Sequence, residues 1–266
     1  MKIALGVEYQ GTRYCGWQSQ ANGCGIQDYL QTALTKIAEH PVQVVCAGRT
    51  DTGVHAIEQV IHFETDAARP ISAWVRGTNA NLPNDIAVLW ACSVGVEFHA
   101  RFSAKSRSYR YILLNRPQRP ALASGRVGWY HQALDLDAMR RAAQCFVGRR
   151  DFSAFRSSEC QAKSPVKTLY SFHIERINDY VIFDLHADGF LHHMVRNLIG
   201  SLVYVGSARG DEAWIATLLE GRDRRQAAPT FAPDGLYLTR IEYDPGWALP
   251  QRQVIGRQEF LAELAL

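Results

Sequence analysis

The residues best suited to chemistry stand together in segment 47–56, which reads AGRTDTGVHA. Asp51 lies between two threonines, two residues after Arg49. The segment is polar and marked by glycines, and apolar, β-prone runs flank it, so we predict a loop between two strands. Loops held by a rigid sheet often carry catalytic groups. An ionised carboxylate in such a loop can act as a nucleophile that splits one difficult step into two easier ones.

Two other interpretations of Asp51 compete with this one. The first needs no catalytic chemistry, and the second implies a different reaction. In the first, Asp51 and Thr52 build a local turn and Arg49 forms a surface ion pair. In the second, the letters Asp-Thr-Gly mark an aspartic protease, whose two carboxylates share one proton. The sequence holds no second Asp-Thr-Gly or Asp-Ser-Gly, and a guanidinium beside the carboxylate would keep it ionised. The protease interpretation is therefore disfavoured, and the local turn stays open.

The composition is that of a folded protein with a strong preference for arginine. Of the 266 residues, 47% are hydrophobic and 21% are charged, which allows one large or two medium domains. The net charge is only +3, but 24 of the 29 basic residues, counted along the sequence, are arginine. Arginine grips phosphate bidentately and stacks on bases. Its clusters fit a nucleic-acid partner, and they fit GC-rich coding or a solvated surface about equally well.

The cysteines and the apolar runs bear on the compartment. None of the six cysteines forms a CxxC pair or a zinc-like spacing, so we expect reduced thiols. The first residues show no leader peptide, and no apolar run reaches the roughly 18 residues of a membrane span. We therefore predict a cytoplasmic protein that has no membrane partner.

The elements that must hold the loop are predicted from hydrophobic periodicity. Strands are expected at 3–9, 42–46, 60–64, 86–93, 107–114, 169–177, 180–187 and 236–243. Helices are expected at 26–38, 70–80, 136–147, 191–203 and 211–220, with a short one after Pro245. Asn178-Asp179 signals a hairpin between two of the strands.

Each half of the sequence combines strands and helices without regular βαβ alternation. That order favours an α+β fold with mainly antiparallel sheet. Residues 115–131 are rich in proline and glycine and are the best linker candidate. We therefore expect an N-terminal α+β domain at 1–105, a connecting strand and linker at 106–131, a C-terminal α+β domain at 132–245 and a tail at 246–266.

Several segments, in the right order along the chain, resemble tRNA pseudouridine synthases of the TruA family. The stretch 48–56 is similar to the family's catalytic loop over its whole length. The other similar segments are EYQGT at 8–12, GWQ at 16–18, FHARFSA at 98–104, YRY at 109–111, DFSAF at 151–155, GFLHHMVRN at 189–197 and APDGLYL at 232–238. One departure is Gln10, where many members carry aspartate. The resemblance covers residues 1 to about 245.

This resemblance implies a fold of two α/β subdomains around mainly antiparallel sheet, with a catalytic cleft between them. It implies an isomerase that converts uridine to pseudouridine in tRNA, with Asp51 as the nucleophile. Arg196 is then expected to form an ion pair with Asp51 and keep it charged. Tyr109 is expected to stack on the target base and help to move protons. Arg49 is expected to occupy the gap left by the flipped nucleotide.

The resemblance also sets expectations for partners and cofactors. Family members act at positions 38, 39 and 40 in the anticodon stem-loop and work as homodimers, so tRNA and a second copy of the chain are the expected partners. The reaction needs no cofactor, and the sequence holds no GxGxxG or GxxxxGK[ST] motif. His192 and His193, placed on a helix, would point about 100° apart, so we expect no metal site. The rival hypothesis is a tRNA-binding protein without catalysis.

Overall fold

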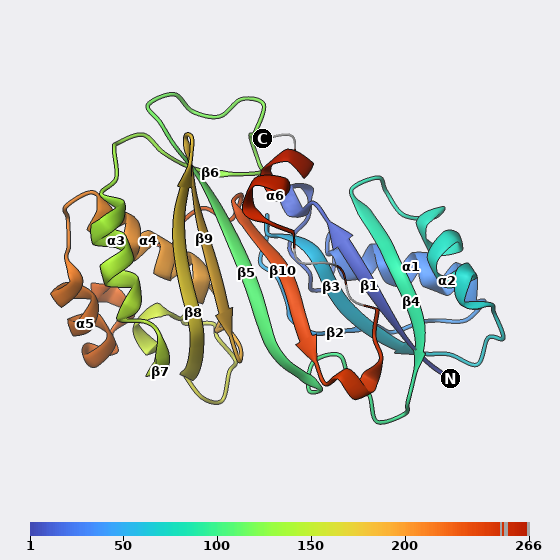
Figure 1. Cartoon of the computed structure of the whole chain (residues 1–266). Helices are drawn as coiled ribbons and strands as arrows, with labels where there is room; N and C mark the ends of the chain where they lie inside the picture. Colours follow the sequence, from blue (N-terminus) through green and yellow to red (C-terminus); the bar gives the residue numbers. More distant parts are fainter. Residues whose placement is uncertain (251, 253–254, 265–266) are drawn as a thin grey trace. The chain divides into compact units, whose positions relative to one another are not determined.

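The computed structural model describes residues 1–250, 252 and 255–264 and shows an α+β fold whose strands pair mainly antiparallel, as predicted (Figure 1). Contacts between Cα atoms group Met1–Ser106 with Tyr237–Val254 as unit 1, and Arg107–Leu236 with Ile255–Leu266 as unit 2. Each unit thus contains a segment from the end of the chain. The domain bounds expected from the sequence are contiguous ranges, and they stay a prediction of which parts fold independently.

Unit 1 is built on antiparallel strands around β1 (Lys2–Tyr9). This strand pairs on one side with β3 (His55–Glu64) and on the other with β4 (Ile86–Val94). The short β2 (Val45–Cys46) also pairs antiparallel with β3. From the far end of the chain, β10 (Leu236–Tyr243) joins β3 in parallel, with Tyr237 opposite His55. The pairing of β3 with both β2 and β10 fixes the two ends of the segment that carries Asp51.

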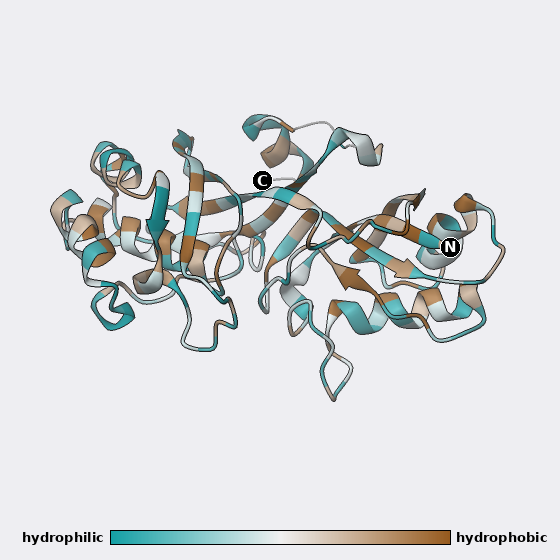
Figure 2. Cartoon of the chain, turned by 90° about the horizontal axis from the view of Figure 1, so that it is seen from below, coloured by the Kyte–Doolittle hydropathy of each residue, from teal (hydrophilic) through white to brown (hydrophobic). Residues whose placement is uncertain are grey.

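The described residues of unit 1 also form two α-helices, and α1 (Ile26–Ala38) has the bounds expected from the sequence. Its buried residues follow helical spacing: Ile26, Leu30, Ala33, Leu34 and Ala38. Glu39 takes a left-handed conformation with φ of 61°, and His40-Pro41 follows it, so the helix ends there. The second helix, α2 (Ile71–Asn79), packs against α1 and against β4. Figure 2 shows hydrophobic residues along the strands of the sheet.

Unit 2 is also built on antiparallel strands. Here β5 (Ala104–Asn115) pairs antiparallel with β9 (Tyr180–Ala187), which pairs with β8 (Val166–Ile177), which in turn pairs with β7 (Gly148–Asp151). The β8–β9 connection is the predicted hairpin, and its Asn178 has a φ of 53°, a conformation that asparagine tolerates.

The segment expected to be a linker is partly ordered into the sheet of unit 2. Within it, β6 (Gly128–Tyr130) pairs in parallel with β5. Gly128 faces Tyr111, and a Cβ at this position would overlap the tyrosine hydroxyl. Gly128 therefore allows close packing. The sequence pattern does not distinguish a glycine of this kind from one in a flexible linker.

Three helices of unit 2 pack around its core: α3 (Leu136–Gln144), α4 (Met194–Gly206) and α5 (Glu212–Gly221). The N-cap of α3 is Asp135, whose carboxylate accepts the N–H of Ala138 at 2.9 Å. The prediction placed the start of α4 three residues too early. His193 precedes the helix with a φ of 63°, and this left-handed residue interrupts the apolar periodicity that extends back to residue 191.

The tail returns to unit 2 as a short helix, α6 (Arg257–Glu263), as expected for the region after Pro245. Phe260 and Leu261 are buried, and the Arg110 guanidinium lies 4.8 Å from the Phe260 ring centroid. Arg257 donates to Asp184 at 2.6 Å. Residues 251, 253–254 and 265–266 of the predicted tail lie outside the described part. Among the described helices, none is long and apolar enough to cross a membrane.

The expectation that all cysteines are reduced is wrong for one pair. Cys15 and Cys24 form a disulfide, with Cα atoms 5.4 Å apart. The segment between β1 and α1 folds back on itself, and the Cys15 N–H donates to the Cys24 carbonyl at 3.0 Å. This return brings together two cysteines whose separation of nine residues matched no redox or metal motif.

Candidate active site

Asp51 lies in a loop of unit 1, between the end of β2 at Cys46 and the start of β3 at His55, as the sequence predicted. The strand after the loop begins five residues earlier than expected, because its first half is rich in polar residues that are nevertheless buried. Asp51 is half-buried, and its carbonyl accepts the N–H of Val54 at 3.1 Å. The loop is therefore a short, tight connection.

The residue before the carboxylate, Thr50, is anchored on two sides. Its hydroxyl forms a hydrogen bond of 2.8 Å with the Tyr9 hydroxyl, at the end of β1. Its carbonyl accepts the N–H of the buried Trp17 at 2.9 Å. Gly16 has a φ of 87°, and a Cβ there would lie 2.8 Å from the Thr50 carbonyl oxygen. A glycine at this position therefore lets the segment before α1 support the loop closely.

The other end of the loop is fixed by His55, which is 2% exposed. Its Nδ1 accepts the Gly11 N–H at 3.0 Å, so the neutral ring carries its proton on Nε2. The ring stacks on Tyr237 of β10, with centroids 4.5 Å apart and planes 21° from parallel. The partners of His55 come from opposite ends of the chain, and nothing in the motif Gly-Val-His indicates them.

Arg49 is exposed at the start of the loop, which leaves its guanidinium accessible to a polyanion. The charge of Arg49 affects the pKa of the Cys46 thiol at the end of β2. Burial raises the pKa of Cys46 to about 12, and the positive charges of Arg49 and Arg101 act against this rise. Two cations from different segments thus influence the same point at the end of β2.

Unit 2 holds Tyr109, which lies on β5 opposite Leu185 of β9. Its ring is half-buried and meets the Phe190 ring edge-on, with centroids 5.0 Å apart. Tyr111, two residues on, is fully buried and donates from its hydroxyl to the Ala232 carbonyl at 2.9 Å. Tyr111 is therefore a core residue, whereas Tyr109 keeps part of its ring accessible.

Unit 2 also holds Arg196, on the first turn of α4. Its Nε donates to the Phe231 carbonyl at 2.8 Å, and the Phe231 N–H donates back to the Arg196 carbonyl at 3.2 Å. One turn later, a Cβ at Gly200 would overlap the Pro229 carbonyl. The small residue lets the segment 229–231 lie against the helix, and this segment orients the guanidinium.

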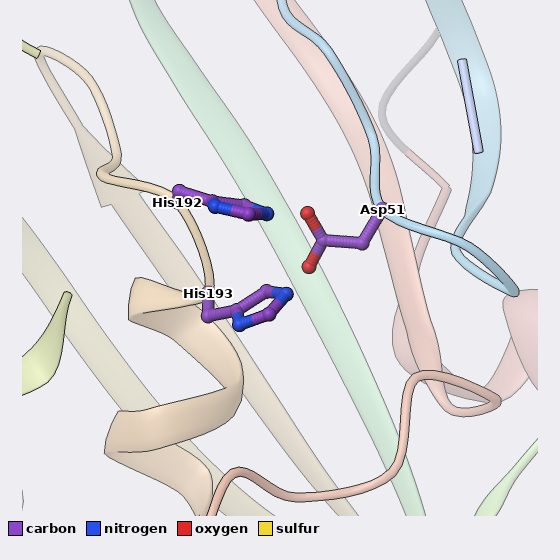
Figure 3. Close-up of side chains that lie close together, drawn as sticks. All are labelled: Asp51, His192 and His193. Atoms are coloured by element: carbon purple, nitrogen blue, oxygen red, sulfur yellow. The ribbon is translucent and has the colours of Figure 1, made fainter. Parts of the chain in front are cut away.

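The two histidines before α4 do not lie on a helix, so the premise of the 100° divergence is wrong. His193 is the left-handed residue at the helix start, and the two rings lie with centroids 4.0 Å apart and planes inclined by 42°. Figure 3 shows both imidazoles on the turn that leads into α4, and it also labels Asp51 on its loop. The absence of a metal site stays a prediction.

The comparisons with known proteins agree with each other. The family described as tRNA pseudouridine synthase matches residues 6–103 and 142–244. A protein named tRNA pseudouridine synthase A from Chromobacterium violaceum is 58% identical over 253 residues, 95% of this chain and 97% of its own length. One of the same name from Aromatoleum aromaticum is 57% identical over 250 residues, 94% of this chain and 95% of its own.

A solved Cbf5-Nop10-Gar1 complex gives a much weaker match. The TM-score is 0.39 at 12% identity, over 89% of this chain and 48% of that chain. The sequence relatives, by contrast, extend over nearly the whole chain, and the matched family ranges contain Arg49, Asp51 and Arg196. The chain therefore belongs to the tRNA pseudouridine synthase A family.

Proposed function

We propose that this protein isomerises uridine to pseudouridine at positions 38, 39 and 40 in the anticodon stem-loop of tRNA, as an intramolecular transferase with Asp51 as its nucleophile. The observation that carries the proposal is the anchoring of the Asp51 loop. Thr50 on one side and His55 on the other are buried and hydrogen-bonded, so the carboxylate is presented from a fixed backbone. A preorganised nucleophile lowers the cost of reaching the reacting geometry.

The reaction conserves every atom of the nucleoside. The carboxylate of Asp51 adds to the sugar C1′ or to the base C6 and later leaves again. The bond between C1′ and N1 breaks, the uracil turns, and a bond forms between C1′ and C5. N1 gains a proton and C5 loses one, so no oxidant, reductant or group donor is consumed. Carboxylates are established covalent catalysts of this kind.

The other predicted site residues have roles in the same proposal. Arg196, oriented by Phe231, forms the ion pair that keeps Asp51 charged while substrate excludes water. Tyr109 stacks on the extruded uracil and assists proton transfer through its hydroxyl. Arg49, exposed beside the nucleophile, occupies the space that the extruded nucleotide leaves. We also propose that the protein works as a cytoplasmic homodimer, which light scattering and cell fractionation can test.

The decisive experiment replaces the nucleophile. We expect Asp51→Ala to abolish tritium release from tRNA that carries 5-tritiated uridine, while the tRNA Kd stays within about threefold of wild type. Mass spectrometry should map the wild-type product to positions 38–40. Asp66→Ala is the matched control, because Asp66 is an exposed aspartate of the same unit.

Two results would contradict the proposal. Near-normal tritium release by Asp51→Ala would remove the nucleophile from the mechanism. A wild-type protein that binds tRNA but releases no tritium would instead support the tRNA-binding protein without catalysis.

A further inference from the structure

An exposed aromatic residue stands on unit 1, outside every role assigned above. Phe102 lies in the turn before β5 and is 77% exposed. A phenylalanine that is this exposed has no part in the core. Its ring stacks on His99, and the Arg101 guanidinium lies beside it.

The turn that carries Phe102 is built around His99. The Nδ1 of His99 accepts the backbone N–H of Arg101 at 3.2 Å and that of Phe102 at 3.3 Å. The His99 N–H donates to the Ser103 hydroxyl at 3.0 Å, and the Ser103 N–H donates to the His99 carbonyl at 2.9 Å. These bonds fix the backbone on both sides of Phe102, so its ring is presented from a rigid support.

The rings of Phe102 and His99 are already stacked, with centroids 4.3 Å apart and planes 29° from parallel. Burial, with help from the Lys2 charge, lowers the pKa of His99. The imidazole is therefore neutral at physiological pH, as its acceptor role toward two N–H groups also requires. One side of the phenyl ring has an aromatic partner, and most of the rest faces solvent.

The turn is also tied to the strands of unit 1. Ala100 is buried, its N–H donates to Nδ1 of His62 on β3 at 3.1 Å, and its carbonyl accepts the Tyr243 hydroxyl at 2.6 Å. The platform formed by Phe102 and His99 thus shares β3 with the Asp51 loop. A movement of one relative to the other would break buried hydrogen bonds.

Positive charge accompanies the platform. The Arg101 guanidinium carbon lies 5.8 Å from the Phe102 ring centroid. The field of Arg101 reaches the Cys46 thiol together with that of Arg49, so both cations lie near the end of β2 where the catalytic loop begins. An exposed ring beside cations suits a nucleotide, because every nucleotide offers the π-face of its base and a negatively charged phosphate.

We propose that Phe102, backed by His99, is a stacking platform for an unpaired nucleobase of the RNA substrate, and that Arg101 faces the adjoining phosphate. The inference rests on the proposed function, since it takes tRNA as the ligand. It adds a positioning residue, which holds RNA beside the active site and does not touch the isomerised base. The stacking platform therefore changes the affinity for the RNA substrate and not the rate of the chemical step.

The test compares Phe102→Ala with Phe102→Trp, and uses Val96→Ala, another residue of unit 1 that is 78% exposed, as the matched control. Stacking of one base predicts that Phe102→Ala raises the Kd and the KM for tRNA by roughly tenfold, with kcat within about twofold of wild type. Phe102→Trp should restore the affinity, and a short single-stranded oligouridylate should quench its fluorescence. Val96→Ala should match wild type.

Three outcomes would overturn the platform. The first is a tRNA Kd for Phe102→Ala within twofold of wild type. The second is a change in the number of subunits measured by light scattering, because Phe102 would then contact a second copy of the chain. The third is a loss confined to kcat. The Kd measurements are repeated in Asp51→Ala, so they do not depend on turnover, whereas failure of the proposed function would appear as absent tritium release in the wild type.

Discussion

The carboxylate of Asp51 owes its position to residues that carry no charge. Hydrogen bonds of Thr50 and His55 hold the backbone of its loop against residues about 30 to 45 positions earlier in the sequence. The His55 ring also stacks on Tyr237, about 180 positions later. The motif in the sequence predicts Asp51 and Arg49 as site residues. The supporting residues lie in other segments that resemble the family, but a motif does not show which residues touch one another in the fold.

His62 is a buried histidine, and its ring must stay neutral to accept the Ala100 N–H. It therefore makes the stability of the fold depend on pH. Burial, and the neighbouring His99 and Lys2, lower the pKa of His62 to about 4, against a partial opposing effect of Glu64. The unfolded chain therefore binds this proton more tightly than the folded one. The resulting stability is fully present above pH 6.5 and is lost as the pH falls toward 4.

We therefore expect the free energy of unfolding to drop between pH 7 and pH 4 by about 1 to 3 kcal/mol more in wild type than in His62→Asn. The asparagine oxygen can accept the same N–H but does not titrate. Urea unfolding at a series of pH values measures the difference. Parallel pH profiles for the two proteins would show that His62 is not the titrating group.

At the scale of the elements, hydrophobic periodicity predicts the bounds of a helix well where one face is buried and the opposite face is exposed to solvent. The helix α1 follows that pattern and ends at a left-handed residue before a proline, so its bounds were predicted correctly. In α4 nearly every residue is buried, and the apolar pattern extends beyond the helix into the turn at His193. The sequence therefore predicted the helix but misplaced its start.

The packing of α4 leads to a prediction at Gly200. A Cβ there would overlap the Pro229 carbonyl, so Gly200→Ala must push away the segment that orients Arg196. We expect a loss of about 1 to 3 kcal/mol in unfolding free energy, as for other overpacked sites, and a lower kcat with little change in KM.

The matched control for this prediction is Gly221→Ala, at the end of α5. A Cβ at Gly221 meets nothing within 4 Å, so this change should be neutral or slightly stabilising. Thermal unfolding and steady-state kinetics on both variants give the comparison. Equal behaviour of the two alanine variants would show that the segment 229–231 yields without consequence.

On the scale of the whole molecule, the sequence indicated the α+β class but not how the chain is shared between the two units. Strand composition predicted β10 as the last strand, yet its pairing in parallel with β3 joins residues about 180 positions apart. Local patterns cannot encode such a pairing. The helix α6 was likewise expected only as an appendage, whereas its Phe260 is buried against Arg110 of unit 2.

Phe260→Ala tests whether this last helix is part of the fold. Removing a fully buried phenylalanine costs about 3 to 5 kcal/mol, so the variant should unfold several degrees below wild type. Leu122→Ala is the matched control, because Leu122 is 94% exposed and its truncation leaves no cavity. Differential scanning calorimetry compares them, and equal Tm values would mean that α6 contributes nothing to stability.

The return of the chain end to both units has a consequence for synthesis on the ribosome. Until residue 243 has emerged, β3 has no β10 beside it, and His55 lacks the ring of Tyr237 on which it stacks. Until residue 263 has emerged, Arg110 lacks the ring of Phe260. A nascent chain therefore carries an open edge on β3 from the time that β3 is made until β10 has emerged. The loop that carries Asp51 acquires the Tyr237 contact at its His55 end only once β10 has been made.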